Sequence, residues 1–551
     1  MELGIPLRRL SGLASLIVLA SVAAPGAADA QAIPEPAAIE RTIPTDLQQR
    51  ASAPAILAPV DRPRHDVEDH LQFTLGAVNI DGATVFSEQQ LSRYFEPYLA
   101  TEVDQGKLAQ MADAITAQYR KSGYVLSYAT VPLQNVQAGM VRLAVVEGRI
   151  GRVSVQGAGS SERAIESIAA SLVRDAPVKQ SELERTVGLI RDFPGLTITD
   201  IALVRSDVEG LYTLKVNVLP DRMRALSYFD NRGTGSFARS RIYNSVSWSS
   251  VGIQGDELRV DLFAMPGKAS RYLYGQLLAA LPLGHSGIRL SLSASRGDEY
   301  LQPNEHFDGR TENVTAQLSY PLMRSRTLTV VGKGSFTDWR TNGSVAHTRL
   351  LQDRLRVGRF GVEFNNEGTT HFEGELLLSQ GLSFGGMTRV GDPLASRIDA
   401  SGRFTKASFA LQLAKPLSDV LAIRANAVGQ FADRPLLSAE QISLGGNKVG
   451  RAFKFNELTG DRGLGGGIEL SYHLSESKKI SGLEFFGFLD AGVVADLKSK
   501  SSPARSWSHA SAGVGTRFSL AGTMLSIEAA VPRSDAGHHP PRVFLSALRS
   551  F

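Results

Sequence analysis

Two stretches of the sequence have residue types that could do chemistry. The glycine-rich run Gly463–Gly467 resembles a loop that cradles phosphate, and the pair His538-His539 could bind a metal ion. A phosphate loop also needs a following Lys-Ser/Thr, and a metal site needs companion ligands at suitable spacing; the sequence has neither beside these residues. There is no H-E-x-x-H and no Walker motif. We therefore interpret both stretches as loops and expect no catalytic residue, no cofactor and no metal; the chain is not expected to be an enzyme.

Composition excludes further classes. The 551 residues contain no cysteine, which removes disulfides, thiolate metal sites and cysteine nucleophiles. The net charge of +4 arises from 59 basic and 55 acidic residues without a dense basic block, so no nucleic-acid partner is expected. With 43% hydrophobic and 21% charged residues, the chain is expected to fold, and its length predicts more than one folding unit.

The first thirty residues predict export from the cytoplasm. Arg8 and Arg9 precede the apolar stretch Leu10–Ala24, and Ala28-Asp29-Ala30 follows as a small-residue cleavage pattern. Residues 1–30 are therefore interpreted as a signal peptide cleaved before Gln31. A membrane anchor is the alternative, but the stretch is shorter than the ~20 residues of a spanning helix. After Gln31 no apolar run approaches that length, so a membrane-embedded mature chain must be a β-barrel.

Three regions precede the candidate barrel. Residues 31–72 are rich in proline and are interpreted as a linker or N-terminal arm. Residues 73–149 predict a strand over Phe73–Ile80, a helix opened by a Ser87–Gln90 capping box, a second helix ending at Gly123, and two strands. Residues 150–220 repeat this β-α-α-β-β order, with a second helix opened by Ser181 and Glu184. Units of this kind usually bind other chains.

From residue 221 to 551 the helical period gives way to alternation. In 288–295 apolar and polar residues alternate strictly, and the same pattern recurs in 314–320. A soluble sandwich would also alternate. The signal peptide, the 331 residues without a convincing helix and the terminal Phe551 favour a transmembrane antiparallel β-barrel of about 16 strands.

Several motifs resemble those of one family. The run Tyr119–Tyr124 (YRKSGY), then Val131–Gln134 (VPLQ) and Val145–Gly148 (VVEG) resemble the first polypeptide-transport-associated (POTRA) domain of two-partner secretion transporters. In the C-terminal region, Phe229–Gly233 (FDNRG) resembles the first barrel strand of the family and Tyr320–Arg326 (YPLMRSR) one of its periplasmic turns.

The sharpest match lies between residues 444 and 463. The segments Leu444–Gly446, Arg451–Phe453 and Leu458–Gly463 resemble the sixth extracellular loop of the family. The resemblance implies a loop that folds back into the barrel and meets an inward-facing Phe-x-Asp strand motif. It carries over to the following residues: Arg451, Phe453, Gly460, Asp461, Gly463, Phe488 and Asp490.

The resemblance places Arg451 against Asp490 inside the barrel. Alternation independently puts Asp490 on the luminal face, since Phe485 and Leu489 fall on the other face. A contact that only stabilises the barrel is the alternative reading. The chain departs from the family at Ala452, where glycine is usual, and at Gly450, which replaces an apolar residue.

The resemblance implies an outer-membrane pore with periplasmic POTRA domains that exports a partner exoprotein by two-partner (type Vb) secretion. The POTRA sheet edges are expected to capture the unfolded secreted polypeptide by β-augmentation. Outer-membrane lipid is the other expected partner, and the chain is expected to be a monomer. The alternative function is an assembly insertase of the same superfamily, which usually has more POTRA repeats; a passive porin would not need these repeats.

Overall fold

The computed structural model describes residues 72–233, 240–267, 270–301, 307–474, 480–500, 502–535 and 540–551. The expected signal peptide, the arm before Gln72 and the pair His538-His539 lie outside these ranges. Across the described ranges, no helix combines the length and the hydropathy of a membrane-crossing segment.

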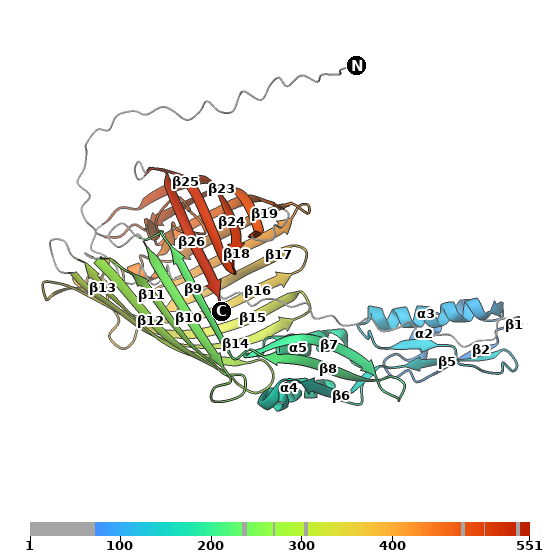
Figure 1. Cartoon of the computed structure of the whole chain (residues 1–551). Helices are drawn as coiled ribbons and strands as arrows, with labels where there is room; N and C mark the ends of the chain where they lie inside the picture. Colours follow the sequence, from blue (N-terminus) through green and yellow to red (C-terminus); the bar gives the residue numbers. More distant parts are fainter. Residues whose placement is uncertain are drawn as a thin grey trace, which may run out of the picture. The chain divides into compact units, whose positions relative to one another are not determined.

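The first α/β unit packs two helices against a three-stranded sheet (Figure 1). The sheet order is β2-β5-β4, with β2 and β5 parallel, and β1 pairs separately with β3. Its elements are β1 (Gln72–Thr74), β2 (Ala77–Asp81), α2 (Glu88–Ser92), a 3-10 turn (Glu96–Tyr98), β3 (Glu102–Asp104), α3 (Gln105–Lys121), β4 (Tyr128–Thr130) and β5 (Met140–Val146).

The capping box and the second helix of this unit are confirmed, but the first helix ends at Ser92 and is followed by a 3-10 turn, and the first strand is divided. The Ser87 side chain accepts from the Gln90 N–H at 3.3 Å, and the Gln90 side chain accepts from the Ser87 N–H at 3.0 Å. The apolar face of α3 is buried, and Gly123 follows it with φ +90°. The single strand expected over Phe73–Ile80 is two strands, because the Leu75 N–H turns away to donate to Thr101 O at 3.0 Å.

The second α/β unit repeats the arrangement with sheet order β6-β8-β7. It contains β6 (Arg149–Gln156), α4 (Glu162–Ala169), α5 (Gln180–Arg191), β7 (Leu196–Arg205) and β8 (Leu211–Pro220), with 3-10 turns at Gly159–Ser161 and Ala170–Leu172. The predicted start of the second helix was wrong by two residues. Lys179 is the N-cap, because the Glu182 side chain accepts its N–H at 3.1 Å.

The C-terminal region is a closed antiparallel barrel of sixteen strands, as the alternation predicted (Figure 1). Its strands are β9 (Met223–Asp230), β10 (Arg241–Ser249), β11 (Glu257–Met265), β12 (Ser270–Pro282), β13 (Arg289–Leu301), β14 (Phe307–Arg324), β15 (Leu328–Val345), β16 (Thr348–Glu367), β17 (His371–Gly381), β18 (Thr405–Pro416), β19 (Leu421–Ala432), β22 (Arg462–His473), β23 (Ile480–Asp496), β24 (Arg505–Leu520), β25 (Thr523–Ser534) and β26 (Arg542–Ser550). The last strand closes the barrel by pairing with the first over Ser546↔Asp230 to Ser550↔Leu226.

Alternation gives the barrel an apolar outside and a polar inside. On β23, Leu489 is 68% exposed while the next residue, Asp490, is 5% exposed. The terminal Phe551 lies on the outer face, and its N–H donates to Ala225 O at 2.8 Å, which anchors the chain end beside the first strand. The motif Tyr320–Arg326 contains the end of β14 and the tight turn into β15.

Candidate functional site

The connection between β19 and β22 contains a short hairpin and a tip. The hairpin pairs β20 (Ile442–Leu444) with β21 (Leu458–Gly460), and a 3-10 turn at Ser438–Glu440 precedes it. Residues 445–457 between the two strands are called the loop tip below. Gly445 and Gly446 adopt φ +117° and +109°, a backbone region that only glycine enters easily, so the chain can reverse here.

Asp490 holds the main chain of the loop tip. Its Oδ1 accepts the Gly450 N–H at 2.7 Å, and its Oδ2 accepts the Arg451 N–H at 3.2 Å. The next amide, that of Ala452, donates to the Ser511 hydroxyl at 3.1 Å. Three successive N–H groups are therefore satisfied by side chains of the luminal wall, which fixes the tip against that wall.

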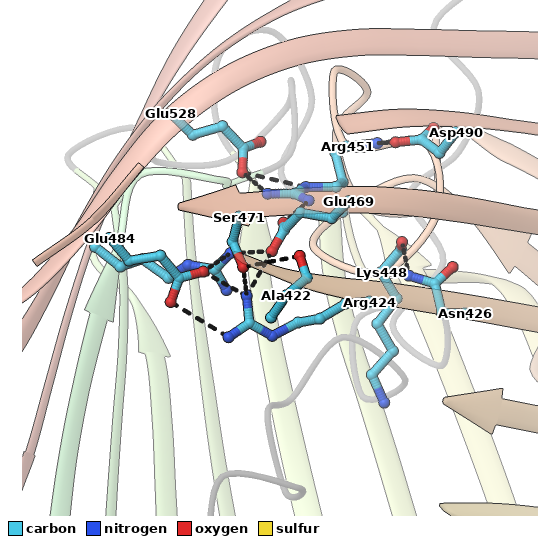
Figure 2. Close-up of polar contacts among 12 residues, drawn as sticks. Ala422, Arg424, Asn426, Lys448, Arg451, Glu469, Ser471, Glu484, Asp490 and Glu528 are labelled. Atoms are coloured by element: carbon cyan, nitrogen blue, oxygen red, sulfur yellow. Dashed lines mark hydrogen bonds and ion pairs between the residues drawn. The ribbon is translucent and has the colours of Figure 1, made fainter. Parts of the chain in front are cut away.

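The guanidinium of Arg451 binds two glutamates rather than Asp490. Nη1 lies 2.6 Å from Glu469, and Nε and Nη2 both donate to Glu528, Nε at 3.1 Å. The plane of the group stacks on Phe488, with Cζ 3.7 Å from the ring centroid. The expected side-chain pair of Arg451 with Asp490 is thus wrong in detail: Asp490 is occupied by main-chain donors, and the longer glutamates of neighbouring strands reach the guanidinium (Figure 2).

The two glutamates belong to a charge-balanced cluster on the luminal wall. Arg424 binds Glu469 at 3.0 Å and also binds Glu484 (Figure 2). Arg517 binds the same two glutamates. With Arg232 on Glu528, four arginines face four carboxylates. These carboxylates are 5–7% exposed, and ion pairs that are this buried need such a network of hydrogen bonds to offset desolvation. The members are Arg232, Arg424, Arg451, Arg517, Glu469, Glu484, Asp490 and Glu528.

The apolar side chains of the tip fill a small luminal core. Phe453 is fully buried and meets His509 edge-on at 5.2 Å between centroids, and Ala452 packs in the same cluster with Phe486, Phe488 and Phe544. A side chain at Gly450 would not fit, since an added Cβ would lie 2.8 Å from His509 Nε2 and φ is +73°. The two departures from the family pattern are therefore compatible with a tightly packed tip.

Arginines at the ends of β9 and β26, the two strands that close the barrel, also donate hydrogen bonds to the loop tip. Arg232, just after β9, donates from Nη1 to Gly446 O at 3.0 Å and to Arg451 O at 2.7 Å. Arg542, the first residue of β26, donates to Ala452 O at 3.0 Å and to Glu457 at 2.9 Å. The first and last strands are thus linked through the loop as well as by their own ladder.

The remaining motif residues lie at the base of the loop. Asp461 is fully buried and accepts the N–H groups of Leu436 and Leu497, each at 2.9 Å, and two donors from Arg397. Gly460 and Gly463 pack against β23, where an added Cβ would lie 2.8 Å from Ala495 N and 3.0 Å from Val493 O. These three residues shape the base, and within the described ranges none of them contacts Arg451.

The sequence reasoning missed Glu469, Glu528 and Arg232. The first two lie on luminal faces that alternation marks, because Ile468 and Leu470 flank Glu469 and Ile527 and Ala529 flank Glu528. A search for acidic residues at inward positions would have found both. Arg232 was part of a recognised motif, but nothing in the sequence indicates that it faces the loop.

The fold and the loop define a class: a POTRA-containing outer-membrane barrel with a loop bound in its lumen. The family model described as "Haemolysin secretion/activation protein ShlB/FhaC/HecB" matches residues 214–518, and the model "POTRA domain, ShlB-type" matches residues 73–148. Since the first match covers more than half of the chain, the chain belongs to this family of secretion transporters.

Named relatives agree with this assignment. The chain is 25% identical to the heme/hemopexin transporter protein HuxB of Haemophilus influenzae (strain 86-028NP), over 84% of each chain. It is 22% identical to the outer membrane transporter CdiB of Escherichia coli, over 81% of this chain and 76% of the relative. Among solved structures, CdiB from Escherichia coli aligns with a TM-score of 0.73 at 19% identity, covering 93% of this chain and 95% of the other.

The chain is therefore an outer-membrane transporter of the two-partner secretion type, with periplasmic POTRA domains and a barrel that exports a secreted polypeptide. The family assignment favours export over the insertase alternative.

Proposed function

We propose that the loop tip is the gate of the export pore. The observation that carries this proposal is that residues 450–452 are bound to the luminal wall by Asp490 and Ser511, while the side chain of Arg451 binds Glu469 and Glu528 of the same wall. In the bound position the tip occupies the lumen. Export then requires the tip to move, and the chain acts by binding and passage rather than by catalysis.

The arrangement of charges allows this movement. If Arg451 leaves, Glu469 keeps Arg424 and Arg517, and Glu528 keeps Arg232. Glu469 and Glu528 therefore stay paired, which avoids the large cost of a buried glutamate that has lost its only partner, while Asp490 gives up the two tip amides. The cluster can release the loop while the barrel itself remains stable.

Capture of the unfolded partner is assigned in this proposal to the free sheet edges of the POTRA domains. The sheet orders leave β2 and β4 at the edges of the first unit and β6 and β7 at those of the second, where β6 is already bridged at Ile150 to Val173. An extended chain can add to such an edge through main-chain hydrogen bonds, which makes binding tolerant of sequence. The exposed apolar residues Leu133 and Met140 lie near the β4–β5 side and offer further contact. Because a single chain closes the barrel, we propose a monomeric pore.

The test replaces the loop residues and measures secretion and folding separately. Arg451→Ala and Asp490→Ala should leave a heat-modifiable barrel in the outer membrane while lowering secretion of the partner about tenfold or more, because each removes contacts that position the tip. Arg451→Lys should restore secretion only in part, since an ammonium cannot reproduce the two-sided fork or the stacking on Phe488.

Arg424→Ala is the matched control. It removes an arginine from the same cluster but no contact to the loop tip. Secretion near the wild-type level in this variant, with loss in Arg451→Ala, supports the gate. Normal secretion by folded Arg451→Ala and Asp490→Ala variants would refute it, and failure of both variants to insert would make the contact structural.

A further inference from the structure

The outer wall of the barrel carries an apolar groove on its lipid-facing side. The groove has a volume of about 600 Å³ and lies across β16 to β19. Two cross-strand rows form it. The row nearer the extracellular end runs Phe360, Leu378, Ala407, Phe431, and the second row runs Leu376, Phe409, Gly429.

Small residues make the floor of the groove and large ones its walls. Ala407 lies between Leu378 and Phe431 in the row nearer the extracellular end, and in the second row the Phe409 ring lies over Gly429, so close that an added Cβ would lie 2.4 Å from it. Phe360 and Phe431 are 76% and 60% exposed. The result is an apolar groove between projecting aromatic rings, whose lining and volume suit an acyl chain.

Arg462 lies at the extracellular end of the groove. Although it stands within the loop motif, it has no role in holding the loop tip. It begins β22 on the lipid-facing side, in the same alternation as the exposed Leu464, Ile468 and Leu470. Its Cζ lies 3.9 Å from the centroid of the Phe431 ring, and its Nε donates to Ala432 O at 2.9 Å. In the described part of the chain its Nη1 and Nη2 have no carboxylate partner.

Two more arginines flank this position. Arg403 is exposed two residues before β18, and Arg434 is exposed two residues after β19. Asp433 accepts the Thr405 N–H at 2.9 Å, which places the start of β18 beside the end of β19. Three guanidiniums and one carboxylate thus gather at the extracellular rim of an apolar groove. Arg434 pairs with Asp433, which leaves the rim with a surplus of positive charge.

We propose that this surface binds one phosphorylated glycolipid of the outer leaflet, of the lipid A type, with an acyl chain in the groove and a phosphate on Arg462. The stacked guanidinium is already oriented by Phe431 and Ala432 O, so its two free nitrogens offer the planar fork that phosphate oxygens accept. A zwitterionic phospholipid would fill the groove but leave the surplus positive charge unmatched. Charge complementarity therefore selects the phosphorylated glycolipid.

The experiment uses the full chain, purified in detergent and stripped of lipid. Native mass spectrometry and a thermal-unfolding titration measure binding of bisphosphorylated lipid A, dephosphorylated lipid A, phosphatidylcholine and inorganic phosphate. We expect one tightly retained lipid A per chain and a clear thermal stabilisation by it alone. Equal binding of the dephosphorylated form or of phosphatidylcholine would overturn the proposal, and so would a response to inorganic phosphate as large as that to lipid A.

Variants separate the headgroup contact from the groove. Arg462→Gln should weaken lipid A binding about tenfold, the effect expected of one charge-assisted contact, and Arg462→Lys should recover part of it. Ala407→Phe fills the groove while keeping all three arginines and should also weaken binding, so the proposal stays testable if Arg462→Gln does not fold.

Arg549→Gln is the matched control, because Arg549 stacks on Phe551 on the same outer face but at the periplasmic end, with Cζ 5.1 Å from the ring centroid. Unchanged binding in this variant supports a specific site. Equal loss in Arg549→Gln and Arg462→Gln would show general attraction to basic residues and would overturn the proposal.

Discussion

Two carboxylates in distant parts of the chain hold loops in the same way, yet they should differ in what they stabilise. In the first periplasmic unit, Glu147 Oε1 accepts the consecutive N–H groups of Thr84 and Val85 at 2.8 and 2.9 Å. In the barrel, Asp490 accepts those of Gly450 and Arg451 at 2.7 and 3.2 Å. Both carboxylates belong to motifs that are visible in the sequence: Glu147 directly follows β5, and Asp490 lies within β23.

The difference lies in what surrounds each loop. Glu147 also accepts the Tyr119 hydroxyl at 2.7 Å, and Tyr119 is fully buried in the core of the unit. The loop at Thr84 and Val85 leads directly into α2, so it is part of the fold. The loop tip at Arg451, in contrast, is an addition to a barrel whose sixteen strands close without it. The same hydrogen-bonding device is expected to maintain the fold in one case and the position of a loop in the other.

The largest difference between the two carboxylates is expected in the stability that Glu147→Ala removes. This substitution removes the acceptor for two amides, the Thr84 hydroxyl and the Tyr119 hydroxyl, so we expect the first unit to lose about 2–3 kcal/mol of stability. The chain has no cysteine, so a single cysteine replacing the buried Ala112 in α3 can report unfolding through its rate of thiol labelling in urea. Glu147→Gln keeps an acceptor for the amides, so its unfolding midpoint should lie between those of the wild type and Glu147→Ala. A wild-type unfolding midpoint for Glu147→Ala would contradict the structural role.

A smaller effect is expected from Gly450→Ala in the barrel. The added methyl meets His509 Nε2 at 2.8 Å in a backbone with φ +73°, so the bound position of the tip should be disfavoured by about 1–2 kcal/mol. The expected result is faster protease cleavage within residues 445–457, with unchanged heat modifiability of the barrel.

Ala452→Gly is the matched control for Gly450→Ala. It restores the family glycine two residues away and removes only one buried methyl, so it should change cleavage less. If Gly450→Ala unfolded the barrel, the distinction between fold and loop position would be lost.

The sequence predicted different parts of the molecule to different depths. The period of two predicted the barrel, because each strand has one apolar and one polar face, and the same argument placed Asp490 in the lumen. It did not predict that Glu469 and Glu528 would take the Arg451 side chain. Their strands are set beside the tip by the register of the closed barrel, which no local pattern specifies. The sequence could therefore predict which residues face the lumen, but not which of them contact Arg451.

The loop motif also concealed separate roles. Asp461, Gly460 and Gly463 recur with Arg451 in the family pattern, which suggested one site, but they shape the base of the loop by close packing. Arg462, between two of them, points to the outer face. Spacing in sequence cannot distinguish these positions, because the hairpin of β20 and β21 brings the base and the tip to different surroundings.

The smallest expected effect is a loss of stability of the first periplasmic unit in acid, which follows from the pKa of Glu147. Burial alone would raise the pKa of Glu147, but hydrogen bonds from Thr84, Tyr119 and Val85 outweigh it and hold the pKa below its ordinary value. A carboxyl with a lowered pKa in the folded state contributes stability above the pKa of the unfolded chain, about 4.3, and loses it as the pH falls through the folded value.

The first unit should therefore be stable at neutral pH and lose part of its stability as the pH drops below about 4.3. The buried cysteine at position 112 can follow this with an aromatic disulfide reagent that reacts in mild acid. Glu147→Gln has no proton to bind, so the difference in unfolding midpoint between wild type and this variant should shrink as the pH falls. A constant difference from neutral pH to below the pKa of a free glutamate would mean that the charge of Glu147 does not matter and that its hydrogen bonds act only as neutral contacts.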